Sequence, residues 1–443
     1  MSHAREAGTG TAGALVRNTM WLAGGRVASQ LLSVALTVVL ARGLGTAGFG
    51  QFAFVGAVVA IGNIVTSFGT DSLLVREIAS GRGEPARLLA AALGLQLVLS
   101  AGFVLLVLAG AGWLPNRTGD TVAALRIYTL SLFPLAFTSV YAAALRGSER
   151  MDLYAFLSVG AAALQAGAAL AAVRAGAGLP AVMIWLLAAQ ATGAGLGWLL
   201  CRAALPGFAL AAPTAAAPLV GLLQRVWPFA LLAGLAIVSQ RIGVLLLALL
   251  AGDAPAGWFA AAARVVEGLK LTQNAFLGAL LPLASRLGAQ AGGMPGGGGG
   301  ERAAAHEWLA RVVRRSRLVL LATSAGAAIA ASTLAAPLVG LLYGEAYYPA
   351  VTALRILAWA LVPFAAAAPT TLALVSTGHE RVVLRAAGVA VVVTAGLGAW
   401  LVSRAGVNGV CAAVVAGEVV RSVLIILQGG RIGAPRFAPD TTA

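Results

Sequence analysis

Apolar runs of about 20 residues recur from one end of this chain to the other. A transmembrane helix needs a run of that length to cross the hydrocarbon core of a bilayer. Of the 443 residues, 60% are hydrophobic and only 10% are charged, which is too little charge to cover the surface of a soluble protein of this length. The sequence therefore predicts an all-α, polytopic membrane protein.

Twelve apolar runs are bounded by charged residues, glycine or proline, and each predicts one membrane-spanning helix. Their approximate limits are 17–41, 47–69, 87–110, 122–145, 153–173, 180–201, 226–250, 256–282, 318–342, 353–375, 383–403 and 407–427. An even number of spans places both chain ends on one side of the membrane, and most arginines lie on that side. The opposite loops hold little beyond Arg42, Arg117, Arg174 and Arg404. This asymmetry predicts that both termini are cytoplasmic.

The two halves of the chain repeat each other. The aligned pairs are LGTAGFGQFA at 44–53 with AGDAPAGWFA at 251–260, LRIYTLSLFP at 125–134 with LRILAWALVP at 354–363, and GSER at 147–150 with GHER at 378–381. Three matches in the same order indicate an internal duplication. Because each half carries an even number of spans, the repeat is parallel, about an axis along the membrane normal. We therefore expect two six-helix bundles around a central cavity.

The spans and the segments between them predict a domain organisation. It comprises a cytoplasmic N-terminal tail at 1–16, a first bundle at 17–201, a cytoplasmic linker at 202–225, a second bundle at 226–428 and a cytoplasmic C-terminal tail at 429–443. A glycine-rich cytoplasmic loop at 285–317 interrupts the second bundle. Residues 301–317 predict a basic helix at the membrane surface, touching anionic headgroups. The alternative is a solvated helical extension of the ninth span.

Several functional classes are disfavoured by the composition. The net charge of +15 comes from arginines scattered between apolar spans, and no basic domain lies outside them, so we expect no nucleic-acid partner. Cys201 and Cys411 lack metal-ligand spacing and are interpreted as small apolar residues. His3, His306 and His379 all fall in polar segments outside the spans. We therefore expect no metal, no cofactor and no catalytic centre.

Charged residues interrupt the eighth span. Arg264, Glu267, Lys270 and Asn274 fall within an arc of about 120° on a helical wheel, so one face of this helix is polar. A charge near the middle of a membrane helix costs about 2.5–3.5 kcal/mol on insertion scales. Glu267 can pair with Arg264 or Lys270, which leaves one cation over. The face predicts either an ion pair that locks two helices or a wet cavity for an anion.

Other positions bear on this choice. Across the repeat, Arg264, Glu267 and Lys270 align with Ala57, Ala60 and Asn63, so the charged face is particular to the second half. Arg26 in the first span and Arg241 in the seventh have no acid within helical reach on their own helices. Both could also extend to the membrane interface. Glu418 and Arg421, three residues apart in the last span, are expected to pair with each other.

A family resemblance adds to this interpretation. The stretch RNTMWLAGGRVASQLLSVALTVVLARGLGTAGFGQFAFVGAVVAIGN, followed by GTDSLLVREIA, resembles the polysaccharide-transporter branch of the multidrug/oligosaccharidyl-lipid/polysaccharide (MOP) exporter superfamily. That branch includes flippases for O-antigen and capsular repeat units. The resemblance is specific in residues 17–80 and extends over the chain as a six-plus-six architecture.

The resemblance implies a V-shaped pair of six-helix bundles in the bacterial cytoplasmic membrane, working by alternating access. It implies a polyprenyl-diphosphate-linked oligosaccharide as substrate, with a glycan polymerase and glycosyltransferases of the same pathway as partners. In such flippases the first, second, seventh and eighth spans form a cationic cavity. The residues expected to bind the diphosphate are Arg26, Arg241, Arg264 and Lys270. The residues expected to give the cavity polar support are Glu267, Asn274 and Asn63.

Three other functions remain open. A flippase for the peptidoglycan lipid precursor would use the same chemistry on another headgroup. A drug antiporter of the same superfamily would be expected to line its cavity with carboxylates, and few lie inside these spans. A membrane glycan polymerase would need a sizeable extracytoplasmic loop with acid–base residues, whereas the extracytoplasmic connections here are short and contain no histidine.

Overall fold

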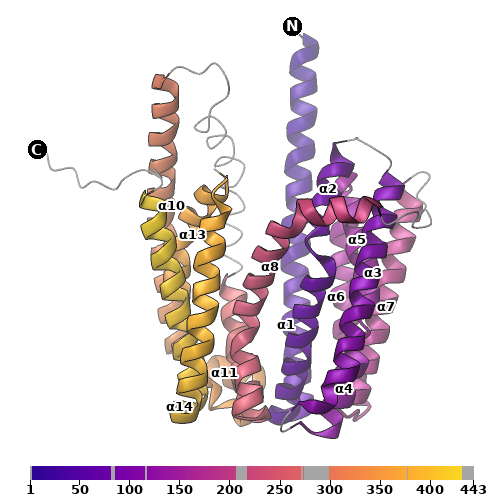
Figure 1. Ribbon diagram of the computed structural model, residues 1–443, viewed down its shortest axis with the longest axis vertical. Helices are drawn as coiled ribbons and strands as arrows, with labels where there is room; N and C mark the ends of the chain where they lie inside the picture. The colour runs from indigo at the N-terminus through magenta and orange to yellow at the C-terminus, as the bar shows by residue number, and fades with distance from the viewer. Residues whose placement is uncertain are drawn as a thin grey trace, which may run out of the picture. The chain divides into compact units, whose positions relative to one another are not determined.

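The computed structural model describes residues 2–80, 85–114, 117–205, 217–270, 273, 299–376 and 378–431. The regular structure in these residues is helical, and none of them lies in a strand. The helices group into two compact units, Met1–Ile237 and Val238–Ala443. Figure 1 shows the helices of both units, labelled where there is room.

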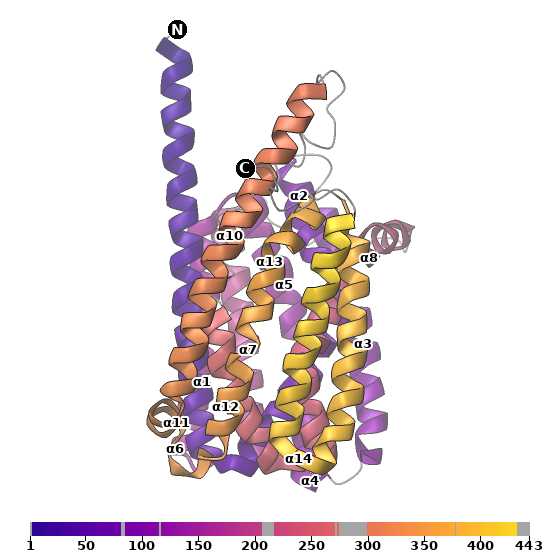
Figure 2. The same ribbon diagram turned by 90° about the vertical axis from the view of Figure 1, so that its left-hand side faces the viewer.

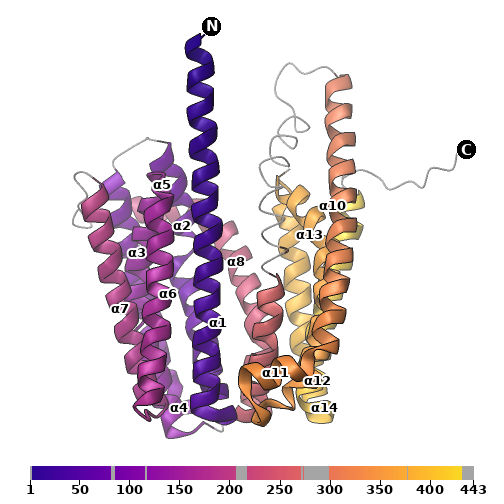
Figure 3. The same ribbon diagram turned by 180° about the vertical axis from the view of Figure 1, so that it is seen from behind.

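The first unit contains the helices before residue 238. They are α1 (Ser2–Ser67), α2 (Thr70–Ala79), α3 (Pro85–Gly110), η1 (Ala111–Trp113), α4 (Gly119–Thr129), α5 (Leu132–Gly147), α6 (Met151–Arg174), α7 (Leu179–Ala204) and the first part of α8 (Ala217–Leu250). Figure 3 shows α1, α6 and α7 side by side, and these helices pack along their lengths. Because α1 begins at Ser2, the predicted N-terminal tail at 1–16 is helical from Ser2 onward.

The second unit contains the rest of α8 and the helices that follow it. They are a helix at 253–270, α10 (Gly299–Thr333), α11 (Ala335–Tyr343), η2 (Glu345–Tyr347), α12 (Ala350–Ala358), α13 (Leu361–Ser376) and α14 (Glu380–Arg431). In Figure 2, α10, α12, α13 and α14 face the viewer, and α13 packs against both α10 and α14.

The structure agrees with twelve membrane spans. In the described residues, nine helices are long and apolar enough to cross a membrane. Two of them, Arg17–Ser67 and Glu380–Gly430, have 51 residues each and bend at Gly45 and Gly406, so each holds two predicted spans. The remaining span, predicted at 256–282, is described as a helix up to residue 270 and again at residue 273.

The internal repeat is visible in the backbone. In each half the fourth span is broken in two, between α4 and α5 and between α12 and α13. A proline removes one backbone donor, and its ring clashes with the carbonyl group four residues earlier. Pro134 and Pro363 stand four residues after the breaks at Leu130 and Trp359. The aligned LRIYTLSLFP and LRILAWALVP motifs therefore produce the same break.

Glycines at two pairs of turns also match. Gly45 and Gly252 follow the first span of each half and have φ of 69° and 101°. Gly176 and Gly406 lie at the turn between the last two spans of each half, with φ of 65° and 53°. Glycine adopts this left-handed region at no steric cost. The duplication thus extends to the turn at Gly176 and Gly406, which the sequence alignment did not include.

The ninth span differs from the prediction. It was expected at 318–342, but α10 ends at Thr333 and a separate short helix, α11, begins at Ala335. Pro337 explains the break, because its ring opposes the carbonyl group of Thr333, four residues earlier. The basic stretch 301–317 is part of α10, so it is an extension of the ninth span. Residues 285–298 of the glycine-rich loop lie outside the described residues.

Buried apolar side chains form the core of each unit. In the first unit, Leu74, Leu93, Val140 and Leu157 belong to one cluster that joins α2, α3, α5 and α6. Small residues allow close helix contacts in membranes. Both cysteines are free and buried, in agreement with their interpretation as small apolar residues.

Candidate functional site

Three charged side chains form an ion triad in the second unit. Arg264 Nη1 lies 3.0 Å from Glu267 Oε2, one helical turn along the same helix. Arg241 Nη1 on α8 lies 3.7 Å from the other carboxylate oxygen, Glu267 Oε1. These side chains are only 22%, 27% and 30% exposed for Arg264, Glu267 and Arg241. Glu267 therefore links α8 to the helix at 253–270.

The helix hairpin that carries the triad is held by close packing. Gly243 on α8 lies against the ring of Phe259, which is 2% exposed, and a Cβ at residue 243 would overlap that ring. Gly243 stands two residues after Arg241 on α8, and Phe259 stands two helical turns before Glu267 on the helix at 253–270. Packing thus fixes the spacing across which Arg241 and Glu267 meet.

Tyr343, the last residue of α11, adds a hydroxyl group near the triad. Burial raises the pKa of Tyr343 to about 12, an effect that the Arg264 charge opposes and the Glu267 charge reinforces. The phenol therefore stays protonated at physiological pH and remains a hydrogen-bond donor. In the part of the chain that the structure describes, its buried oxygen has no hydrogen-bond partner.

Lys270 is the only lysine in the chain, and it is not one of the described ion-pair partners of Glu267. Its Nζ atom is 5.1 Å from the centroid of the Phe364 ring on α13. The ion pairs found among the described residues give Lys270 no carboxylate partner. Of the two partners predicted for Glu267, the structure selects Arg264 and adds Arg241, and among the described residues Lys270 has no counter-charge. A partly buried, uncompensated cation favours an anionic ligand.

The other predicted site residues are not part of this group. Arg26 lies exposed on α1, beside Gly25, which packs against Ala155 of α6. Asn63, also on α1, is half-buried, and its backbone carbonyl accepts a hydrogen bond from Thr66 Oγ1 at 3.2 Å. Both belong to the first unit. Asn274 lies outside the described residues.

Sequence reasoning missed Phe364 and Tyr343. A signal for Phe364 was present, because it follows Pro363 in the repeated motif, where the first half has Leu135 after Pro134. Because the aromatic residue occurs only in the half that carries the extra charges, a contact between its ring and one of those charges could have been predicted. Tyr343 gave no such signal, since the unpredicted break at Pro337 determines its position.

The first unit holds a polar network of its own, at Asp71. Ser139 Oγ on α5 donates a hydrogen bond to Asp71 Oδ1 on α2. Gln96 Nε2 on α3 donates to Thr70 Oγ1 at 2.7 Å and lies 3.5 Å from Ser139 Oγ. These contacts join α2, α3 and α5, and they satisfy side chains that would be costly to bury alone. Among the described residues, no group of three metal-ligating side chains occurs.

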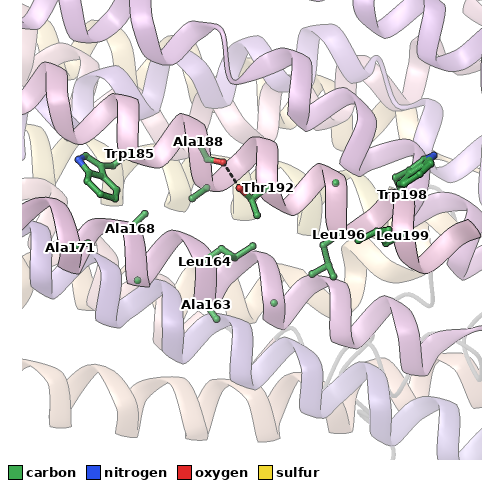
Figure 4. Close-up of a pocket in the computed structure, with 14 residues that line it drawn as sticks. Ala163, Leu164, Ala168, Ala171, Trp185, Ala188, Thr192, Leu196, Trp198 and Leu199 are labelled. Carbon is green, nitrogen blue, oxygen red and sulfur yellow. Dashed lines mark hydrogen bonds between the residues drawn. The ribbon is translucent and has the colours of Figure 1, made fainter. Parts of the chain in front are cut away.

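An apolar groove lies between α6 and α7 in the first unit. It has a volume of about 1120 Å³ and runs between Trp185 and Trp198, as Figure 4 shows. Its lining contains no charged side chain, and the Thr192 hydroxyl group donates to the carbonyl oxygen of Ala188 at 2.9 Å. A groove of this composition offers no group that could recognise a headgroup, and we assign it no role.

Solved structures share this fold. The inward-facing conformation of a multidrug resistance MATE family transporter of the MOP superfamily matches with a TM-score of 0.72 and 19% identity, over 92% of this chain and 94% of that one. The lipid II flippase MurJ, in an inward closed conformation, matches with a TM-score of 0.72 and 10% identity, over 92% and 87%. A MOP superfamily transporter from Pyrococcus furiosus, described by the reverse polarity of its binding pocket, matches with a TM-score of 0.60 and 16% identity, over 95% of each chain. No curated protein matched.

The long apolar helices and the fold define a multi-pass membrane protein with the twelve-helix architecture of MOP superfamily transporters. Residues 15–288 match the family model described as "Polysaccharide biosynthesis protein". This match covers more than half of the chain. The chain belongs to the polysaccharide biosynthesis protein family.

Proposed function

We propose that this protein is a flippase that moves a polyprenyl-diphosphate-linked oligosaccharide across the bacterial cytoplasmic membrane for surface polysaccharide biosynthesis. Family membership supports the glycan pathway, and the fold supports a transporter. Partners in this proposal are the glycosyltransferases that build the lipid-linked glycan and the polymerase that receives it. No chemical step is needed, so the protein acts as a transporter and not as an enzyme.

The observation that carries the proposal is the surplus of positive charge among the partly buried residues of the second unit. Among the described residues, Arg241 and Arg264 share the Glu267 carboxylate, and Lys270 forms no ion pair. A diphosphate diester carries about two negative charges at neutral pH, which would balance this surplus. At the low effective dielectric of a membrane interior, such complementarity is worth more than it is in water. The Tyr343 hydroxyl group supplies a neutral donor beside the same charges.

In this mechanism the cations bind the diphosphate, and the protein carries it across the membrane by alternating access. Arg26 would be a further cation for the diphosphate, and Asn63 and Asn274 would provide polar support. The polyprenyl chain stays in lipid throughout. The topology required is one with both termini in the cytoplasm, so that the loaded lipid enters from the leaflet where it is made.

A flippase for the peptidoglycan lipid precursor is the second candidate, favoured by the fold shared with the lipid II flippase MurJ. It would use the same cations on the same diphosphate and would differ only in the sugar. A drug antiporter for organic cations is less well supported, because the partly buried charges have the wrong sign for such a ligand.

The proposal is tested by deleting the gene and measuring polyprenyl-linked oligosaccharide on each leaflet, together with surface glycan. We expect the lipid-linked oligosaccharide to accumulate on the cytoplasmic leaflet and the surface glycan to be lost. Re-expression of the wild-type protein, or of Arg404→Gln as a control, should restore both. Arg404 suits this purpose because it is exposed, its guanidinium carbon lies 4.0 Å from the Trp400 ring centroid, and it is not one of the triad residues. Normal surface glycan without accumulation in the deletion strain would sink the proposal.

A further inference from the structure

We propose that Arg421 is a second ligand-binding cation that acts with Lys270 at the Phe364 ring, and that the two form one subsite for a phosphate or diphosphate group. The inference deepens the proposed function and rests on it for the identity of the lipid that carries the group. The affinity of the subsite for the anion does not depend on that identity.

The two cations meet at one aromatic ring, although three different helices carry the participating residues. Lys270 Nζ lies 5.1 Å from the Phe364 centroid, and Arg421 Cζ of α14 lies 5.5 Å from the same centroid. The two charges can therefore be no further apart than these two distances combined. One diphosphate, with a hydrogen bond of about 2.8 Å at each end, has the reach to contact both.

The charges at the ring are not balanced. Arg421 Nη2 donates to Glu418 Oε1, one turn earlier on α14, so this carboxylate compensates the arginine. No described carboxylate is found within ion-pair distance of Lys270. The attraction of a cation to a phenyl ring is weaker than an ion pair, and two cations at one ring also repel each other. A bound anion would remove that repulsion.

Partial burial makes this imbalance matter. The side chains of Arg421 and Glu418 are only 18% and 16% exposed, and Lys270 and Phe364 are half-buried. Water therefore screens these charges less than it would at a surface. The remaining exposure leaves a route by which a ligand can reach the cations.

A hydrogen bond fixes Arg421 beside the ring before any ligand arrives. The Ser422 hydroxyl group donates to the carbonyl oxygen of Pro363 at 2.6 Å, and Ser422 is 3% exposed. Ser422 directly follows Arg421, and Pro363 directly precedes Phe364. This contact thus ties the two backbone segments together where the cation and the ring meet. A binding group held in place beforehand loses less entropy when the ligand binds.

The test uses the full-length protein purified in detergent, with farnesyl diphosphate, inorganic pyrophosphate and farnesol as probes in calorimetric titrations. We expect farnesyl diphosphate to bind more tightly than pyrophosphate, and farnesol to give no saturable binding. Arg421→Gln and Lys270→Gln should each weaken farnesyl diphosphate by about 10- to 100-fold, as expected for the loss of one charge-assisted hydrogen bond. Arg421→Lys should recover part of the affinity. Arg404→Gln, a stacked arginine of the same helix, should bind like the wild type.

The proposal is overturned if Arg421→Gln, shown to be folded by its elution profile and melting temperature, binds farnesyl diphosphate like the wild type. Pyrophosphate binding as tight as that of farnesyl diphosphate would overturn the assignment of the subsite to a lipid headgroup. If only the proposed function is wrong, the gene deletion leaves surface glycan normal, but the affinity for farnesyl diphosphate still depends on Arg421. The two failures are therefore distinguishable.

Discussion

At the scale of single residues, Glu267 is the side chain on which the arrangement of cations depends. Its two oxygens serve Arg264 on its own helix and Arg241 on α8. The carboxylate therefore has a structural role as well as an electrostatic one. It holds two guanidinium groups near each other at partial burial, where they would otherwise repel.

Replacement of Glu267 by Gln should destabilise the protein by about 1–3 kcal/mol, because two partly buried arginines lose their shared counter-charge. Thermal unfolding in detergent measures this effect as a lowered melting temperature. Glu345→Gln is the matched control, since Glu345 is exposed on η2 and surface changes usually stay within about 0.5 kcal/mol. Equal melting temperatures for the two variants would show that Glu267 does not hold the arginines.

Unlike Glu267→Gln, Tyr343→Phe should weaken ligand binding without lowering the stability of the protein. Its hydroxyl group is buried without a hydrogen-bond partner in the described structure, so removing it should leave the melting temperature unchanged or slightly raised. If the hydroxyl group donates to the bound anion, as we propose, affinity for farnesyl diphosphate should fall by about 3- to 10-fold. A clear loss of stability would mean that the hydroxyl group has a structural partner in the folded protein.

The sequence allowed much of this site to be predicted, for a local reason. Arg264, Glu267 and Lys270 share one face of one helix, and helical periodicity alone identifies such a face. Their contacts with Arg241, Tyr343 and Phe364 could not be predicted in this way, because those residues lie on other helices. Tertiary packing brings them together, and no spacing in the sequence records it.

At the scale of helices, proline and glycine account for most of the departures from straight spans. The breaks before Pro134 and Pro363 follow from the repeated motif that contains them. The break before Pro337 was missed, because residues 334–343, LAAPLVGLLY, continue the apolar run through it. Hydrophobicity marks a span, but the missing amide of proline decides where the helix stops.

Gly243→Ala should lower the melting temperature, because a Cβ there overlaps the buried Phe259 ring and forces α8 away from the helix at 253–270. We expect a loss of about 1–3 kcal/mol, typical of overpacking. Gly326→Ala on α10 is the control, since a Cβ there meets nothing within 4 Å and alanine favours a helix by about 0.5–1 kcal/mol over glycine. A Gly243→Ala protein as stable as the control would contradict the close packing of this hairpin.

At the scale of the whole molecule, the even number of spans and the distribution of arginines predict the orientation in the membrane. The two native cysteines are buried, so a single introduced cysteine can report on one loop. Trp113 is 89% exposed in a loop predicted to be extracytoplasmic, and Glu149 is exposed in a loop predicted to be cytoplasmic. Trp113→Cys should react with an impermeant maleimide in intact cells, and Glu149→Cys only after permeabilisation. The reverse pattern would invert the topology and, with it, the direction of transport that we propose.

The central claim is that the partly buried cations of the second unit carry a diphosphate-linked lipid across the membrane. The most direct measurement is the rate at which a defined polyprenyl-diphosphate oligosaccharide crosses the bilayer of proteoliposomes that contain equal amounts of wild-type protein, Arg264→Gln, Lys270→Gln or Arg404→Gln. We expect the first two variants to slow translocation by at least about tenfold, as the loss of one charge-assisted contact predicts, and Arg404→Gln to match the wild type. Wild-type rates in both Arg264→Gln and Lys270→Gln would contradict the account and reduce these charges to a structural role.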